Sequence, residues 1–147
     1  MELLATVAVI LIMTAIAVPV MKDVMASYRL NSAVTTVSGA IQSTRYQAIY
    51  QGYAYQVAFD PTAKTFQVQS KPLTAAAFAN VGTATYWADS AARVTLGAAT
   101  TLTFSPGGKV TLNNGASACP CTLTLTYPSK TPKVITVSAY GNITVTP

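Results

Sequence analysis

An uninterrupted apolar run is the feature that most constrains the fold of this chain. It extends from Leu3 to Met21 without a charged side chain and closes at Lys22. Its length is close to the roughly 20 residues that a helix needs to cross a bilayer. The whole chain is 51% hydrophobic and 9% charged, and it has 147 residues, enough for one domain with a modest core. These values indicate a protein of a membrane or of a packed assembly.

Two simpler interpretations of the apolar run remain open. A cleaved secretory signal would explain the small residues of Ala15-Ile16-Ala17, but such signals carry basic residues before the apolar run and this chain carries Glu2. An ordinary single-pass anchor would explain the span and Lys22, yet it gives Glu2 no role.

The helical pattern continues beyond Pro19. A proline inside a helix removes one backbone hydrogen bond and kinks the helix without ending it. We therefore predict one helix from about Glu2 to Gln51, about 75 Å long at 1.5 Å per residue and kinked at Pro19, that ends at Gly52. Its half beyond Pro19 is expected to lie half-buried on a soluble domain, through side chains spaced by three and four residues: Met21, Val24, Met25, Tyr28, Leu30, Val34, Val37, Ile41, Thr44 and Ala48.

Beyond Gly52 the pattern alternates with a period of two, which is typical of strands. Residues 53–59 and 65–69 flank the turn signal Asp60-Pro61 and predict a hairpin. Residues 71–92 are expected to form a loop with one short element, and Trp87 is expected in the core. Later strands are predicted at Arg93–Leu96, Thr101–Phe104, Lys109–Leu112, Cys121–Tyr127, Lys133–Val137 and Asn142–Val145, with a turn at Asn113-Asn114-Gly115 among their connections.

These elements predict an α+β protein. A long N-terminal helix, residues 1–52, packs on an antiparallel β-sheet domain, residues 53–147. The apolar first half of the helix is the candidate membrane anchor.

The sequence argues against an enzyme. It has no histidine, and its acidic residues are scattered over four segments, at Glu2, Asp23, Asp60 and Asp89. General acid–base catalysis and most metal sites need histidine or clustered carboxylates. The segment Pro106–Lys109 lacks the earlier glycine and the following Ser or Thr of a phosphate-binding loop, so it is interpreted as a turn. We expect no catalytic residue, no cofactor and no metal.

The N-terminal segment resembles that of type IV pilins and type II secretion pseudopilins. In that family a glutamate leads an apolar helix that a proline interrupts at the spacing of Glu2 and Pro19. The segments Leu102–Gly108 and Val137–Ile143 are similar to the GspH/FimT branch. The family also carries a basic leader that ends in glycine, and a few residues, usually beginning with Phe, before the glutamate. Because only Met1 precedes Glu2, we expect the sequence to be a partly recorded mature chain.

The resemblance implies a structural subunit of an extracellular pilus or pseudopilus filament. Such a subunit sits in the inner membrane before assembly, has a processed and methylated N-terminus, and polymerises through its helix with the help of an assembly machinery. In the family the glutamate pairs with the N-terminal amine of a neighbouring subunit, which makes Glu2 a register device for assembly. A solvated acid at the membrane interface is the simpler alternative. Pro19 either fits the helix to the domain or marks a place where the helix unwinds in a filament.

The two cysteines, Cys119 and Cys121, are a candidate disulfide, because a domain outside the cytoplasm lies in an oxidising compartment. A bridge across one residue requires a turn at Pro120; free thiols or a bridge between subunits are the alternatives.

Basic residues in the later loops carry the alternative function, a membrane-anchored minor pilin or receptor that binds DNA or a surface ligand. Lys109, Lys130 and Lys133 would attract DNA phosphates if they shared one surface, and some FimT-like pilins bind DNA during uptake. The net charge of +5 is small, and lysines that keep the loops solvated explain it better. Binding to nucleic acid is therefore the weaker hypothesis.

Overall fold

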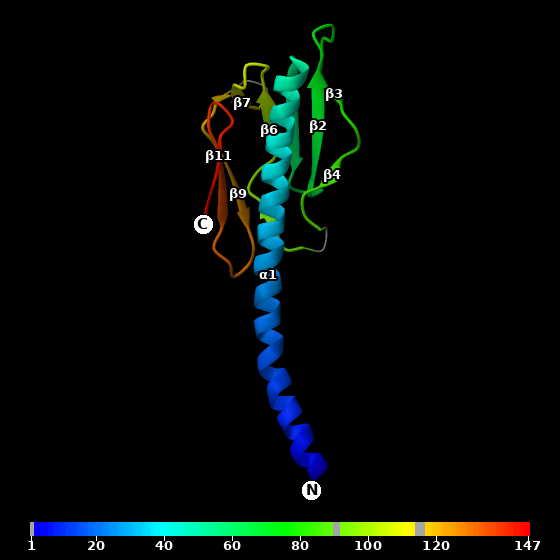
Figure 1. Cartoon of the computed structure of the whole chain (residues 1–147), viewed down its shortest axis with the longest axis vertical. Helices are drawn as coiled ribbons and strands as arrows, with labels where there is room; N and C mark the ends of the chain where they lie inside the picture. The colour runs from blue at the N-terminus through cyan, green and yellow to red at the C-terminus, as the bar shows by residue number, and fades with distance from the viewer. Residues whose placement is uncertain (1, 90–91, 114–116) are drawn as a thin grey trace.

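A single helix, α1 (Glu2–Gln51), forms the spine of the molecule (Figure 1). The computed structural model describes residues 2–89, 92–113 and 117–147, without the side chains of Glu2, Ile16, Ala17 and Pro19. The turn predicted at Asn114-Gly115 therefore lies outside the described residues.

Helix α1 is continuous over 50 residues and runs through Pro19 without a break. It ends where Gly52 adopts a φ of +73° and donates its N–H to the carbonyl of Ala48 at 3.2 Å. Glycine adopts this left-handed conformation without the strain that a side chain would add, so Gly52 acts as the C-terminal stop. The N-terminal part of α1 projects beyond the β strands and bends away from the axis of the rest (Figure 1).

The strands form two antiparallel sheets. The larger, seven-stranded sheet has the order β3-β2-β1-β6-β7-β8, with β4 also paired to β2, and the four-stranded sheet has the order β11-β10-β9-β5. The helix contacts strands of both sheets. The strands are β1 (Ala54–Asp60), β2 (Thr65–Lys71), β3 (Ala79–Asn80), β4 (Thr85–Tyr86), β5 (Thr95–Leu96), β6 (Thr100–Phe104), β7 (Val110–Leu112), β8 (Ser117–Ala118), β9 (Cys121–Thr126), β10 (Lys133–Val137) and β11 (Ile143–Thr146).

The β1–β2 hairpin sets the register of the larger sheet. Its turn forms because the Asp60 carboxylate accepts hydrogen bonds from the backbone N–H groups of Thr62, at 2.7 Å, and Ala63, at 3.0 Å. Val57 then lies opposite Val68 on one side and opposite Leu102 of β6 on the other. This places the central strand β1 in direct contact with the helix.

One stripe of α1 supplies the centre of the core. Its fully buried members are spaced by three and four residues, as an amphipathic helix requires. The stripe begins at Ala26 and continues through Leu30, Ala33, Val34, Val37, Ala40, Ile41, Thr44 and Ala48. The hydroxyl of Thr44 donates to the carbonyl of Ala40 at 2.7 Å, so this buried polar group is satisfied within the helix.

Burial on the helix begins later than the spacing predicted. Met21, Val24, Met25 and Tyr28 share the helical period, yet they are all exposed. The β domain begins to cover α1 only at Ala26, and periodicity alone does not indicate where a partner surface begins. The expectation that these four side chains are buried on the domain was wrong for the single chain.

The loop predicted at residues 71–92 contains two short strands instead of one short element. Strands β3 and β4 both pair with β2 and widen the larger sheet. Trp87 is only 2% exposed and lies in the core, as expected. Its indole N–H donates to the carbonyl of Asp60 at 3.4 Å, which fastens this segment under the hairpin. Strand β8 was not predicted. The bounds predicted for β10 are confirmed, and those of the other predicted strands differ by one or two residues at one end or both.

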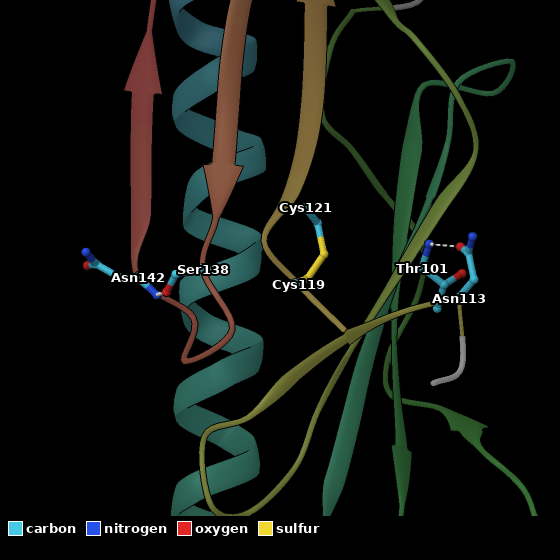
Figure 2. Close-up of a disulfide and its surroundings, with 6 residues drawn as sticks. All are labelled: Thr101, Asn113, Cys119, Cys121, Ser138 and Asn142. Carbon is cyan, nitrogen blue, oxygen red and sulfur yellow. Dashed lines mark hydrogen bonds between the residues drawn. A yellow bond between two sulfur atoms is a disulfide. The ribbon is translucent and has the colours of Figure 1, made fainter. Parts of the chain in front are cut away.

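The disulfide between Cys119 and Cys121 closes the crossing from one sheet to the other. Cys119 follows β8 of the larger sheet, Pro120 turns the chain, and Cys121 begins β9 of the smaller sheet. The two Cα atoms lie 4.6 Å apart, and both cysteines are buried. Figure 2 shows the bridge between the helix and the strands of the larger sheet. The turn at Pro120, which the pairing requires, is therefore also the point where the chain passes from the larger sheet to the smaller one.

We expect Ile41→Ala to destabilise the domain strongly. Ile41 is fully buried at the middle of the stripe, so truncation leaves a cavity and lowers the free energy of unfolding by about 2–5 kcal/mol. The matched control is Ile49→Ala on the same helix, where Ile49 is 45% exposed and the loss is expected to stay below about 1 kcal/mol. Denaturant titration in detergent, followed by Trp87 fluorescence, measures both. Equal losses would contradict the packing described here.

Removal of the disulfide is expected to cost less. The Cys119→Ala/Cys121→Ala double variant should lose about 1.5 kcal/mol of unfolding free energy, because the bridge closes a very short loop. The same titration measures it, with and without a reducing agent. Reductant should destabilise the wild-type chain and leave the double variant unchanged; a wild-type chain that is insensitive to reductant would show that the thiols are not paired.

Candidate assembly and membrane surface

The first half of α1 exposes a continuous apolar surface. Leu3 is 80% exposed, Met13 68% and Met21 70%, and the large aliphatic side chains that the structure describes between them are exposed as well. Soluble monomers rarely expose contiguous apolar patches larger than a few hundred Å². This half of the helix therefore requires a partner, which is either hydrocarbon or other protein surface.

The length and composition of the helix are sufficient to cross a membrane. Helix α1 contains an 18-residue window that meets this criterion, and none of that window is buried within the chain. The two hydroxyl groups of the apolar run are already satisfied: Thr6 donates to the carbonyl of Leu3 at 2.9 Å, and Thr14 donates to that of Ile10 at 2.7 Å. Polar groups satisfied in this way enter an apolar environment at low cost.

Glu2 and Pro19 occupy defined places on this helix. Glu2 is the first residue of α1, so its backbone lies at the helix N-terminus, where the helix dipole favours a negative charge. Pro19 lies within the exposed half, upstream of the first buried residue, Ala26. The side chains of both lie outside the described part of the chain. Their predicted roles in register and in bending stay predictions.

A groove lies where α1 leaves the β domain. We call it the exit groove; it has a volume of about 800 Å³ and is lined by Met21, Lys22, Met25 and Arg29 of α1 and by Arg93 and Tyr127 of the β domain, among other residues. The turn between β9 and β10 closes this end of the domain and is tied to the helix. There Nζ of Lys130 lies 2.7 Å from an oxygen of Asp23. Asp23 is 71% exposed, so this ion pair positions the turn more than it stabilises the fold.

The three candidate lysines do not form one surface. Lys133 is the first residue of β10. Lys109 directly precedes β7, and the N–H of Val110 in β7 donates to the carbonyl of Ala139, which lies beyond the other end of β10. The length of β10, roughly 15 Å, therefore separates the two lysines. The ammonium of Lys130 is paired with Asp23. No shared basic patch for DNA is formed by these three residues.

A second exposed apolar patch lies at the far end of α1. Tyr46 is 66% exposed and Tyr50 is 87% exposed, and Ile49 joins them on the same turn of helix. Sequence reasoning missed this patch. Its signal was present, because these residues lie out of phase with the stripe of Ile41, Thr44 and Ala48 and so cannot face the same core.

The described residues contain no candidate metal centre. No group of three or more Cys, Asp or Glu side chains is close enough to hold a metal in the part of the chain that the structure describes. A hydrogen bond with Tyr53, at 3.2 Å between the hydroxyl oxygens, together with burial raises the pKa of Tyr55 to about 12. Tyr55 therefore stays protonated at physiological pH, in a stacked pair whose position in the core gives it a structural role.

Comparison with known proteins finds likeness in structure and not in sequence. No protein-family model matches the chain, and no curated protein matches its sequence. Two crystal structures of the type IV minor pilin FimU from Pseudomonas aeruginosa are similar. One has a TM-score of 0.59 at 22% identity, over 82% of this chain and 90% of FimU; the other has a TM-score of 0.56 at 20% identity, over 80% and 93%. The predicted α+β architecture is confirmed, and the chain has the fold of a type IV pilin.

Proposed function

We propose that this protein is a structural subunit of a type IV pilus or pseudopilus filament and that it has no catalytic role. It polymerises through the apolar first half of α1, and it sits in the inner membrane as a single-pass protein before an assembly machinery extracts it. The observation that carries the proposal is the exposed apolar first half of α1 on a pilin fold.

The energetics of this surface favour assembly. Removing a large apolar side chain from water stabilises a structure by about 1.5–3 kcal/mol. At least eight such side chains are exposed before Pro19, at Leu3, Leu4, Val7, Val9, Ile10, Leu11, Ile12 and Met13. Their burial, worth roughly 12–24 kcal/mol, is similar to or larger than the roughly 4–15 kcal/mol cost of association. A bundle of such helices is therefore a favourable state once the chain leaves the bilayer.

Glu2 is assigned the task of setting the stagger between subunits. A carboxylate in an apolar bundle is costly when it is unpaired, and a cation from a neighbouring subunit offsets that cost at one position only. The apolar surface supplies most of the binding energy without a preferred register. The charge at the helix start then selects one register among many.

A second subunit contact is proposed at Tyr46, Ile49 and Tyr50. These side chains form an apolar patch on the helix, at the end opposite the membrane-spanning half. Tyrosines are enriched in protein interfaces, where the ring packs and the hydroxyl finds a partner. The patch would bury against the β domain or helix of a neighbouring subunit.

A minor subunit of the same filament is the second candidate. The structures that this chain resembles are of FimU, which is a minor pilin. The copy number of the chain in purified filaments distinguishes a minor from a major subunit, and both share the assembly surface described above.

Substitution of Glu2 should separate insertion from assembly. Glu2→Gln and Glu2→Ala remove the charge and are expected to leave the protein in the membrane while the yield of sheared filaments falls at least about tenfold, the effect of one lost charge-assisted contact. Glu2→Asp retains the charge and is the matched control, expected to keep part of the yield. Quantitative immunoblots of membranes and sheared filaments measure both. Normal filament yield from Glu2→Ala would refute the register role.

Charges placed on the tyrosine patch should block assembly without unfolding the domain. Tyr46→Asp/Tyr50→Asp is expected to lower filament yield severalfold, because two carboxylates would have to lose water in the interface. Tyr140→Asp is the control, since Tyr140 is 74% exposed in a turn of the β domain, away from the patch. Equal yields from both variants would place the subunit contact elsewhere. Trp87 fluorescence verifies that each variant is folded.

A further inference from the structure

We propose that the exit groove binds the phosphate groups of anionic phospholipids in the membrane leaflet next to the β domain. The inference rests on the proposed membrane-anchored state and names the partner of the groove in that state. Two features of the groove support it: its positive charges, and its position along α1 just beyond the apolar run.

The groove carries an excess of positive charge. Lys22 and Arg29 reach it from α1, and Arg93 reaches it from the segment before β5. Asp23 is the one acidic residue among the described residues that line it, and its carboxylate is paired with Lys130 from the facing turn. Three cations from two separate elements therefore converge on one concave surface. Phosphate is the complementary chemistry for such a site, and arginine binds it in a bidentate manner.

The groove lies at the depth of the lipid headgroups. The apolar run from Leu3 to Met21 measures roughly 28 Å along a helix, close to the hydrocarbon thickness of about 30 Å. Lys22 then lies at the edge of the hydrocarbon, and Arg29 lies about 10 Å further along the axis. The headgroup layer on each side is roughly 5–8 Å thick. Lys22 thus lies at the inner edge of this layer, and Arg29 lies just beyond its outer edge.

The rest of the lining matches the same boundary. Met21 and Met25 are exposed apolar side chains that line the groove from α1. Tyr127 and Pro128 line it from the β domain. Tyrosine is enriched at membrane interfaces, since its ring suits the acyl boundary and its hydroxyl suits water. A lipid held here contacts helix and β domain together. Its binding would fix the rotation of the helix, and hence the face of the domain that meets the bilayer.

The test compares the affinities of two lipids for the full-length chain reconstituted in phosphatidylcholine vesicles. Spin-labelled phosphatidylglycerol and spin-labelled phosphatidylcholine are added separately, and electron spin resonance reports the fraction of each that the protein immobilises. We expect phosphatidylglycerol to associate roughly fivefold more strongly, the effect of one cation near a headgroup. The preference should disappear at about 1 M salt, where the Debye length is about 3 Å.

Matched variants assign the preference to the groove. Arg29→Gln/Arg93→Gln should lose most of it, whereas Lys71→Gln/Lys109→Gln should keep it. The control removes the same charge at the opposite end of the domain, since Lys71 pairs with Ala54 just beyond the end of α1 and Lys109 lies in the β6–β7 turn. Loss of preference in both double variants would show a general charge effect and overturn the proposal.

Resistance of the chain to alkaline extraction from the vesicles shows whether it is inserted, and so distinguishes failure of the lipid proposal from failure of the membrane-anchored state. A chain that inserts but shows no preference for phosphatidylglycerol overturns the groove proposal alone. A chain that does not insert overturns the membrane-anchored state and the groove proposal with it. If Arg29→Gln/Arg93→Gln keeps the lipid preference and loses filaments, the groove is a contact with a second copy of the chain, and the lipid proposal is wrong.

Discussion

Burial of the apolar surface of α1 is the constraint on which the rest of the structure depends. The β domain covers a stripe from Ala26 to Ala48 of this 50-residue helix, and no residue that the structure describes covers the half before it. The covered half packs on strands of both sheets and shares one hydrophobic core with them. The uncovered half then extends from a rigid body, and its orientation is set by the packing of Leu30, Val37 and Ile41.

The β domain holds the helix through contacts near both ends of the covered stripe. At the N-terminal end of the stripe, Lys130 in the β9–β10 turn pairs with Asp23. At the other end, Gly141 approaches the side chain of Arg45 so closely that a Cβ atom there would lie 2.6 Å from its Cδ. Between them, the Cys119–Cys121 disulfide fixes the place where the chain passes from one sheet to the other. The smaller sheet is thereby tied to the helix and to the larger sheet.

The helix and the sheet class could be predicted from the sequence because their signals are local. The apolar run, the helical spacing up to Ala48, Gly52 and the alternation around Asp60 each act over a few residues. The start of burial at Ala26, the division into two sheets and the short strands β3, β4 and β8 depend on which segments meet in space. The same limit applies to the site. Lys109 and Lys133 are both basic, but they lie toward opposite ends of β10. Arg29 and Arg93 are distant in sequence, yet they line one groove.

The central claim is that the exposed half of α1 packs against copies of itself in a filament. The most direct measurement is electron microscopy of filaments sheared from cells that express the chain, with mass spectrometry of their subunits and a helical reconstruction. The account predicts that the chain is present in the filaments and that residues 3–21 lie in an apolar core with Glu2 against a neighbouring subunit. Filaments that lack the chain, or a reconstruction that leaves this half of the helix exposed, would contradict it.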